Sequence, residues 1–396
     1  MNSIAGKNFT GGEVSQSGPQ HVLILGVDPR SLINFRKDLI GELKAGGNRV
    51  TVAAMAPSTS QRLALDDLGV DVRTVSFSRT GMNPLHDLAT LGSLFCLFRE
   101  VRPDVIIAYT AKPVIYGALA ARIAGVPRFV AMITGLGYAF VSGSDFRRRV
   151  ARAVAILLYG MALKRCSAII FQNIDDRATI AELGLLKGVA TIGIVNGSGV
   201  DIQYFQPCPL PSKPVFLMVS RLLVDKGVRE YVEAAARLRK MLPEVRTLLV
   251  GGIDPSPNSV SQNELSGWVA GGLEYVGHLD DVRPAVAQAS VIVLPSYREG
   301  TPRSVLEGMA MARAIITTDA PGCRETIKAG VNGILVPPRN SEALFDAMRL
   351  LAAKNSVVES MGRASRQIAE EKYEGKSVAR DIIRLAGLEK CGAGGC

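Results

Sequence analysis

The sequence is poor in cysteine. Its 396 residues include six, which are scattered without the spacing of a metal site and are too few to staple a chain this long. A disulfide-built fold is therefore excluded, and free thiols in a reducing compartment are expected. No stretch reaches the roughly 18–20 consecutive apolar residues that a membrane-spanning helix needs. Residues 1–20 lack the apolar core of a signal peptide and predict a disordered polar tail, so the expected location is cytoplasmic.

Motifs for bound metals and for P-loop nucleotide binding are also missing. No two aspartates are separated by a single residue, so there is no Asp-x-Asp pair to hold Mg²⁺ or Mn²⁺ against a diphosphate. HExxH, zinc-type Cys/His clusters and the GxxxxGK[ST] loop are absent too. Neither a metal nor a cofactor is expected. If a diphosphate leaves during the reaction, fixed positive groups of the protein would have to stabilise its charge.

The remaining composition is that of an ordinary globular protein, with 47% apolar and 21% charged residues, and the length suits two domains. Short β-branched runs alternate with helical patterns in both halves, and a proline-rich stretch at 206–214 interrupts them. Proline at this density continues neither a helix nor a central strand. The expected fold class is α/β, with two doubly wound Rossmann-like domains that face each other across a cleft.

The expected boundaries follow from this alternation: a first domain at 21–205, a linker at 206–214, a second domain at 215–373 and a C-terminal segment at 374–396. Thirteen runs are predicted to be strands, and ligands are expected beyond their carboxyl ends. The predicted strands are His21–Val27, Val50–Ala54, Val72–Val75, Asp104–Tyr109, Arg128–Ile133, Ala168–Phe171, Ala190–Val195, Val215–Ser220, Arg246–Val250, Leu273–Val276, Val291–Pro295, Ala314–Thr317 and Gly333–Val336.

Positive charge is concentrated in the first half, where residues 1–200 carry 22 Lys and Arg against 14 Asp and Glu. The densest cluster opens an amphipathic helical pattern and consists of Arg147, Arg148, Arg149 and Arg152. One interpretation is a core helix with a solvated basic start. The other is contact with anionic lipid, worth about 1 kcal/mol per basic residue near the surface. Nucleic acid is disfavoured as a partner, because no Lys/Arg run has interleaved aromatic residues.

The most informative stretch is PSYREGTPRSVLE, which follows a predicted buried strand. Glu299 falls on the loop after that strand, and Gly300 would let the backbone approach a ligand closely. Pro302 suits the start of a helix, whose free amides could hold a phosphate. Glu307 lies eight residues beyond Glu299, so the two carboxylates could hold hydroxyls on either side of a bound diphosphate. The alternative is a loop charge at Glu299 and a capping or salt-bridging role for Glu307.

Three further residues fall on strand-end loops. Arg221 follows the strand at 215–220, and Lys226 lies at the start of the next helix, so both could reach the phosphates of a ligand in the cleft. Exposed surface charge is the alternative for each. His278 follows another strand and is placed either to approach a nucleotide base or to be an ordinary loop histidine.

The sequence resembles the retaining GT4 glycosyltransferases, which have the GT-B fold. Residues 295–338 contain that family's Glu-x7-Glu element at Glu299 and Glu307, and Arg221 and Lys226 match its Arg/Lys pair at the nucleotide diphosphate. The first half resembles bacterial members, N-acetylgalactosaminyltransferases among them, that extend undecaprenyl-diphosphate-linked sugars. The matching segments are 110–117, 133–138, 171–176 and 197–201.

The resemblance implies a retaining, metal-independent transfer of a hexose or N-acetylhexosamine. The donor would be a nucleotide sugar, expected to be UDP-linked, and the acceptor a lipid-diphosphate-linked saccharide used in surface polysaccharide or glycan synthesis. Glu299 would contact the donor sugar, and Glu307 the ribose. Amides near Gly300 and Thr301 would help the two cations hold the diphosphate, and the loss of either cation would lower kcat by about 10²–10³-fold.

The resemblance also implies where the acceptor and the membrane would lie. The acceptor would enter from the first domain near Lys112, Thr134 and Gly135, and a phosphate oxygen of the leaving group would take its proton. The basic cluster would hold the protein peripherally on the cytoplasmic face of the inner membrane, and the final helix would cross back to the first domain. The alternatives are a nucleotide-sugar epimerase of the GT-B fold and a non-enzymatic scaffold on the membrane surface.

Overall fold

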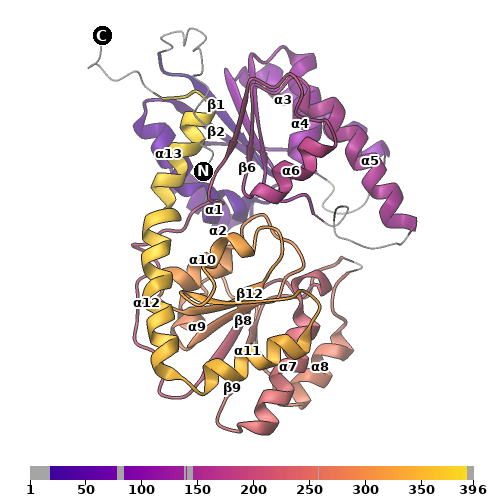
Figure 1. The fold of residues 1–396 in the computed structure, drawn as a ribbon. Helices are drawn as coiled ribbons and strands as arrows, with labels where there is room; N and C mark the ends of the chain where they lie inside the picture. Colours follow the sequence, from indigo (N-terminus) through magenta and orange to yellow (C-terminus); the bar gives the residue numbers. More distant parts are fainter. Residues whose placement is uncertain (1–17, 78–83, 138–139, 141–145, 257, 390–396) are drawn as a thin grey trace, which may run out of the picture.

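Two parallel β-sheets, each with helices on both faces, form two domains that lie one above the other (Figure 1). The computed structural model describes residues 18–77, 84–137, 140, 146–256 and 258–389. The architecture of two doubly wound domains that was predicted from the sequence is confirmed.

The first sheet has seven parallel strands in the order β3-β2-β1-β4-β5-β6-β7. Its inner strands, such as β4, are largely apolar and buried, as expected of a sheet covered on both faces, whereas the edge strand β3 is mostly polar. The order reverses between β1 and β4, and at such a point a doubly wound sheet opens a crevice at its carboxyl edge. The strands are β1 (His21–Leu25), β2 (Arg49–Ala54), β3 (Asp71–Thr74), β4 (Val105–Tyr109), β5 (Arg128–Ile133), β6 (Ala168–Phe171) and β7 (Thr191–Ile194).

Helices on the two faces of this sheet bury two separate apolar clusters. The first of these helices begins at Pro29, directly after Asp28. The Asp28 side chain caps it by accepting a hydrogen bond from the backbone N–H of Arg30 at 3.0 Å. The helices are α1 (Pro29–Ala45), α2 (Thr59–Asp67), α3 (Pro84–Val101), α4 (Ala111–Ala124), α5 (Phe146–Leu163) and α6 (Ile174–Glu182).

The second sheet has six parallel strands in the order β10-β9-β8-β11-β12-β13. They are β8 (Val215–Val219), β9 (Arg246–Val250), β10 (Glu274–Gly277), β11 (Val291–Leu294), β12 (Ala314–Thr318) and β13 (Gly333–Val336). The covering helices are α7 (Val228–Met241), α8 (Gln262–Ala270), α9 (Arg283–Ala287), α10 (Arg303–Ala310), α11 (Ser341–Ala352) and α12 (Asn355–Lys372), with the short 3-10 turns η2 (Val224–Lys226) and η3 (Arg324–Thr326).

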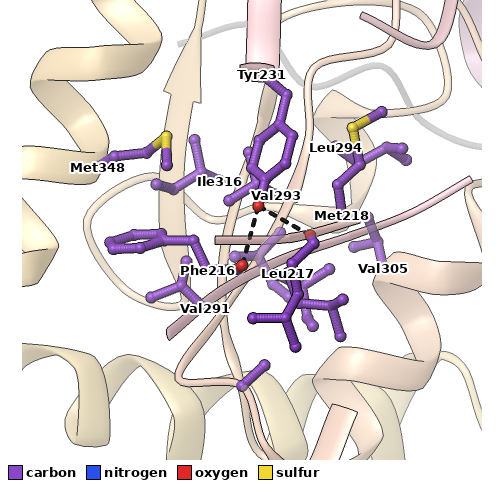
Figure 2. Packing of buried hydrophobic residues seen from close by; sticks show 14 of the residues in the cluster. Phe216, Leu217, Met218, Tyr231, Val291, Val293, Leu294, Val305, Ile316 and Met348 are labelled. Atoms are coloured by element: carbon purple, nitrogen blue, oxygen red, sulfur yellow. Dashed lines mark hydrogen bonds between the residues drawn. The ribbon is translucent and has the colours of Figure 1, made fainter. Parts of the chain in front are cut away.

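A buried tyrosine in the core of the second domain has hydrogen-bond partners for its hydroxyl. Tyr231 of α7 shares its hydroxyl proton between the carbonyl oxygens of Phe216 and Leu248, each at 2.9 Å, in the middle of the apolar cluster (Figure 2). A buried hydroxyl without partners would cost about 1–3 kcal/mol. These two bonds therefore fix α7 against β8 and β9 without that penalty.

The chain passes between the domains twice, at neighbouring points. Val200 and Phe205 already belong to the second domain's core, so this core begins ahead of the proline-rich stretch. The buried Arg313 fastens that stretch by donating to the carbonyl oxygens of Cys208 and Pro209, at 2.9 and 3.2 Å. On the return crossing, α12 is followed by α13 (Gly375–Leu385), which packs against α1 and joins the first domain's core (Figure 1).

Candidate functional site

A cleft of about 780 Å³ lies between the domains, at the carboxyl ends of strands from both sheets. This volume is within the range of small-ligand sites, about 300–1,000 Å³. Seven of the residues singled out from the sequence line it: Thr134, Arg221, Lys226, His278, Glu299, Thr301 and Glu307. The rule that ligands bind beyond strand ends therefore located the cavity correctly.

Lys226 and Glu299 form an ion pair in this cleft. The Lys226 Nζ donates to Glu299 Oε1 at 2.6 Å, and the Ser296 hydroxyl donates to the same oxygen at 2.8 Å. The two charged side chains are only 17% and 15% exposed. Gly227, with φ of 73°, lets η2 approach the end of β11, because a Cβ there would lie 2.2 Å from the Pro295 carbonyl oxygen. The close approach of the two backbone segments therefore brings the side chains of Lys226 and Glu299 together.

Arg221 has a different environment. Its Nη1 donates to Asp254 Oδ2 at 2.8 Å, and its side chain is 64% exposed at the cleft wall. Arg221 and Lys226 therefore line the same cavity, but water screens the first far more than the second.

Glu307 lies on the second turn of α10 and is almost buried. Burial raises the pKa of Glu307, and the adjacent Arg303, whose Nε donates to it at 3.0 Å, opposes that rise. Arg303 also donates to the carbonyl oxygen of Gly199 and lies over the Phe35 ring of α1. Glu307 therefore forms the salt bridge that the sequence left open as one alternative, and it also lines the cleft, where its binding of hydroxyls stays a prediction.

Gly300 approaches the other domain, whereas the sequence predicted an approach to a ligand. A Cβ at this position would lie 2.2 Å from the carbonyl oxygen of Thr134. Gly135, with φ of 122°, faces Gly300 from the first domain. The Thr301 hydroxyl donates to the Gln172 carbonyl oxygen at 3.1 Å. The glycines are required here because two backbones meet.

Two further predicted residues have partners across or outside the cleft. Arg30 Nη1 lies 3.0 Å from His278 Nε2, which must be the acceptor because a guanidinium only donates, so this contact joins the first turn of α1 to the loop after β10. Lys112 begins α4, and its Nζ donates to Asp87 Oδ1 at 3.2 Å. Unlike Thr134, it is not among the described residues that line the cleft.

Sequence reasoning missed the polar side chains of the first domain that bind the Glu299 loop. Asn173 caps α6 and donates from Nδ2 to the Gly300 carbonyl oxygen at 2.8 Å. Asp176, completely buried, accepts from Arg298 Nε at 3.1 Å. Both belong to a segment noted from the sequence only as a family resemblance. An Asn followed three residues later by Asp, after a strand, was the available signal for a capped helix start.

Helix α5 carries the basic cluster on the outer side of the first domain (Figure 1). Arg149 and Arg152 are exposed, whereas the side chains of Arg147 and Arg148 lie outside the described residues. Large apolar side chains are exposed on the same helix, namely Val150, Leu157 and Met161. Over the described ranges, α5 and the other helices are all too short or too polar to cross a membrane.

Metal-ligating side chains do not gather in threes within the part of the chain that the structure describes. Metal independence therefore stays a prediction that needs an assay.

Two family models match the chain. A glycosyl transferase 4-like model matches residues 27–173, and a glycosyl transferases group 1 model matches residues 213–354. Among solved structures, the chain is similar to sucrose-phosphate synthase from Thermosynechococcus elongatus, with a TM-score of 0.76, 17% identity and coverage of 92% of this chain and 98% of that one. Anabaena HepE in complex with UDP-glucose gives a TM-score of 0.72, 20% identity and coverage of 92% and 98%. The chain is a glycosyltransferase with the GT-B fold.

Curated relatives narrow the resemblance. The chain is 29% identical over 369 residues to the N,N'-diacetylbacillosaminyl-diphospho-undecaprenol alpha-1,3-N-acetylgalactosaminyltransferase of Campylobacter jejuni, covering 90% of this chain and 95% of that protein. It is 26% identical to the UDP-Gal:alpha-D-GlcNAc-diphosphoundecaprenol alpha-1,3-galactosyltransferase of Escherichia coli, covering 67% and 70%. The resemblance to bacterial glycosyltransferases that act on undecaprenyl-diphosphate-linked sugars is confirmed.

Proposed function

We propose that this glycosyltransferase moves a hexose or N-acetylhexosamine from a UDP-sugar to a lipid-diphosphate-linked saccharide, with retained configuration and without a metal ion. The observation that carries the proposal is the buried Lys226–Glu299 pair, which lies in the cleft with Arg221 and Glu307. One cation can hold the leaving diphosphate while the carboxylate beside it holds the sugar.

Donor binding would exchange the partners of that pair. The ammonium of Lys226 sits on a flexible stem and can turn from Glu299 toward a diphosphate, whose charge it then shares with Arg221. Glu299 would be left to accept hydrogen bonds from hydroxyls of the donor sugar, still steadied by the Ser296 hydroxyl. Glu307 would accept from the ribose hydroxyls. The amide of Thr301, at the start of α10, would support the diphosphate.

The transfer itself requires no protein base in this scheme. The acceptor hydroxyl would approach from the first-domain wall at Thr134, on the same face as the departing diphosphate. The bond from the anomeric carbon to the diphosphate oxygen breaks, and the bond to the acceptor oxygen forms on that face. The acceptor proton passes to a phosphate oxygen of the leaving UDP. Preorganised cations acting on the developing charge supply the main acceleration.

Two observations support a lipid-linked acceptor at a membrane surface. The named substrates of the C. jejuni and E. coli relatives are linked to undecaprenol through a diphosphate. In this chain, α5 exposes Arg149 and Arg152 together with Leu157, a combination suited to an anionic bilayer surface. We propose that α5 holds the enzyme peripherally on the cytoplasmic face of the inner membrane.

The deciding experiment offers a panel of UDP- and GDP-sugars with a lipid-diphosphate-linked monosaccharide, in the presence of EDTA, and identifies the product by mass. Proton NMR of the product then gives the anomeric configuration. We expect transfer from one UDP-sugar, undiminished by EDTA, with the donor's configuration kept. Loss of turnover under chelation, or an inverted product, would overturn the corresponding part of the proposal. Incubation with the donor alone tests the epimerase alternative, which requires a new sugar to form without an acceptor.

A further inference from the structure

The loop that carries Glu299 is held from the opposite domain. Asn173, which is 1% exposed, donates from Nδ2 to the Gly300 carbonyl oxygen at 2.8 Å and lies 3.3 Å from the Glu299 carbonyl oxygen. Its Oδ1 meanwhile accepts from the Asp176 backbone N–H at 2.7 Å. A single buried amide therefore caps a helix of the first domain and binds the backbone of a loop in the second.

An ion pair reinforces this contact one residue upstream. Arg298, whose side chain is 13% exposed, donates through Nε and Nη2 to Oδ1 of Asp176, which has no exposed surface. The other carboxylate oxygen, Oδ2, lies 3.1 Å from Asn173 Nδ2. Asn173, Asp176 and Arg298 thus form one network in which each polar group supports the next. Burial raises the pKa of Asp176, and the hydrogen-bonded Arg298 offsets part of that rise.

The two domains supply different hydrogen bonds to the backbone at Glu299. The Glu299 N–H donates to the Pro321 carbonyl oxygen at 2.9 Å, within the domain. The carbonyl side, which sets the direction of the loop into Gly300, is bound by Asn173 across the interface. Lys226 and Ser296 thus hold the Glu299 side chain from within the second domain, while Asn173 holds the backbone that follows it from the first domain.

We infer that Asn173 and Asp176 are positioning residues, which fix the Glu299 loop in its working geometry from the opposite domain and so couple domain closure to assembly of the site. This inference rests on the proposed role of Glu299 at the donor sugar. A displacement of about 1 Å at such a group costs about 10²-fold in rate. Removal of the network should therefore lower kcat and leave the binding of the nucleotide almost unchanged, because Arg221 and Glu307 do not belong to it.

The chain offers a matched control next to this network. Asp175 is on the same helical turn as Asp176 and also reaches across the interface, where Arg324 Nη1 donates to its Oδ2 at 2.9 Å. That pair is 34% and 39% exposed and does not touch the Glu299 loop. Asp175→Asn therefore removes an interdomain charge pair without releasing the loop.

The test compares Asn173→Ser, Asp176→Asn and Arg298→Gln with Asp175→Asn, using kcat, the donor KM, UDP affinity by calorimetry and Tm. Serine keeps the helix cap but cannot reach the Gly300 carbonyl oxygen. We expect each of the three variants to lose about 10–100-fold in kcat, while the donor KM and UDP affinity stay within about threefold. Asp175→Asn should keep wild-type kcat. Unaltered UDP affinity also shows that a variant is folded.

A double variant and a Glu299 variant complete the experiment. Asp176→Asn combined with Arg298→Gln should lose no more activity than the worse single change, because both act through one pair. Glu299→Gln separates the two proposals. If it keeps full activity, the proposed function of Glu299 fails. If it inactivates the enzyme while Asn173→Ser and Asp176→Asn behave like Asp175→Asn, the positioning inference fails alone.

Discussion

Lys226 and Arg221 should contribute unequally to catalysis, although both carry one charge in the same cleft. A charge about 4 Å from a phosphate is worth about 4 kcal/mol at an effective dielectric constant of about 20, and about 1 kcal/mol in bulk water. Lys226 is 17% exposed and belongs to the first regime, whereas Arg221 is 64% exposed and tends toward the second. At about 1.36 kcal/mol per tenfold, Lys226→Met should lower kcat by about 10²–10³-fold and Arg221→Met by about 5–10-fold.

The assay is steady-state release of UDP at saturating donor and acceptor. Lys240→Met, which removes a charge from the exposed end of α7, is the control for net charge and should be indistinguishable from wild type. Tm should fall in Lys226→Met, because Glu299 then keeps only the Ser296 hydroxyl as a partner, and in Lys226→Met/Glu299→Gln part of that fall should be recovered. Equal losses of kcat in the two single variants would refute the assignment of strength by burial.

Three further outcomes are expected. Glu307→Gln should raise the donor KM more than it lowers kcat, as seen in initial rates over a range of donor concentrations. Changing both Arg149 and Arg152 to Glu should weaken binding to phosphatidylglycerol vesicles, measured by sedimentation, by more than 10-fold, at about 1 kcal/mol per residue. The same variant should keep its activity on a short-chain acceptor. Undiminished sedimentation would exclude α5 as the membrane contact. Burial, with Asp201 nearby, raises the pKa of Asp38 above its usual 3.8, so the folded protein binds that proton more tightly than the unfolded chain does. Wild-type stability is therefore penalised above the folded pKa, and Asp38→Asn should raise Tm at pH 7 with a gain that vanishes below about pH 4; a gain independent of pH would contradict the linkage.

The strands could be predicted from the sequence because the inner ones are nearly continuous apolar runs and the edge strands are short β-branched runs. β4, Val105–Tyr109, is buried at every residue, and each predicted strand coincides with an observed one to within a few residues. Helices α2, α6 and α8 are hard to predict from the sequence, because each buries only one or two side chains and so has no apolar stripe. α2 and α8 begin instead with capping boxes at Ser58 and Ser261, which a search for periodicity does not detect.

The site could be predicted from the sequence only where its residues come from one domain. Glu299 and Lys226 follow strands of one sheet, so their proximity comes from the topology of that sheet. The contact of Asn173 with Gly300 depends on how the two domains face each other, which no local pattern encodes. Lys112 shows a second limit, since the resemblance put it at the acceptor side of the cleft, whereas it lies in the first turn of α4 and its side chain pairs with Asp87.

The two crossings of the chain have a consequence for dissecting the protein. The Val200 N–H donates to the Tyr373 carbonyl oxygen at 2.7 Å, and the Gly375 N–H donates to the Val200 carbonyl oxygen at 3.0 Å. These two hydrogen bonds join the outgoing and returning segments of the chain where they pass between the domains. After these hydrogen bonds, Val378 and Ile382 of α13 complete an apolar cluster of the first domain that residues 1–200 cannot cover alone. A fragment ending before Tyr373 should therefore aggregate, and a synthetic peptide of the last helix should rescue it.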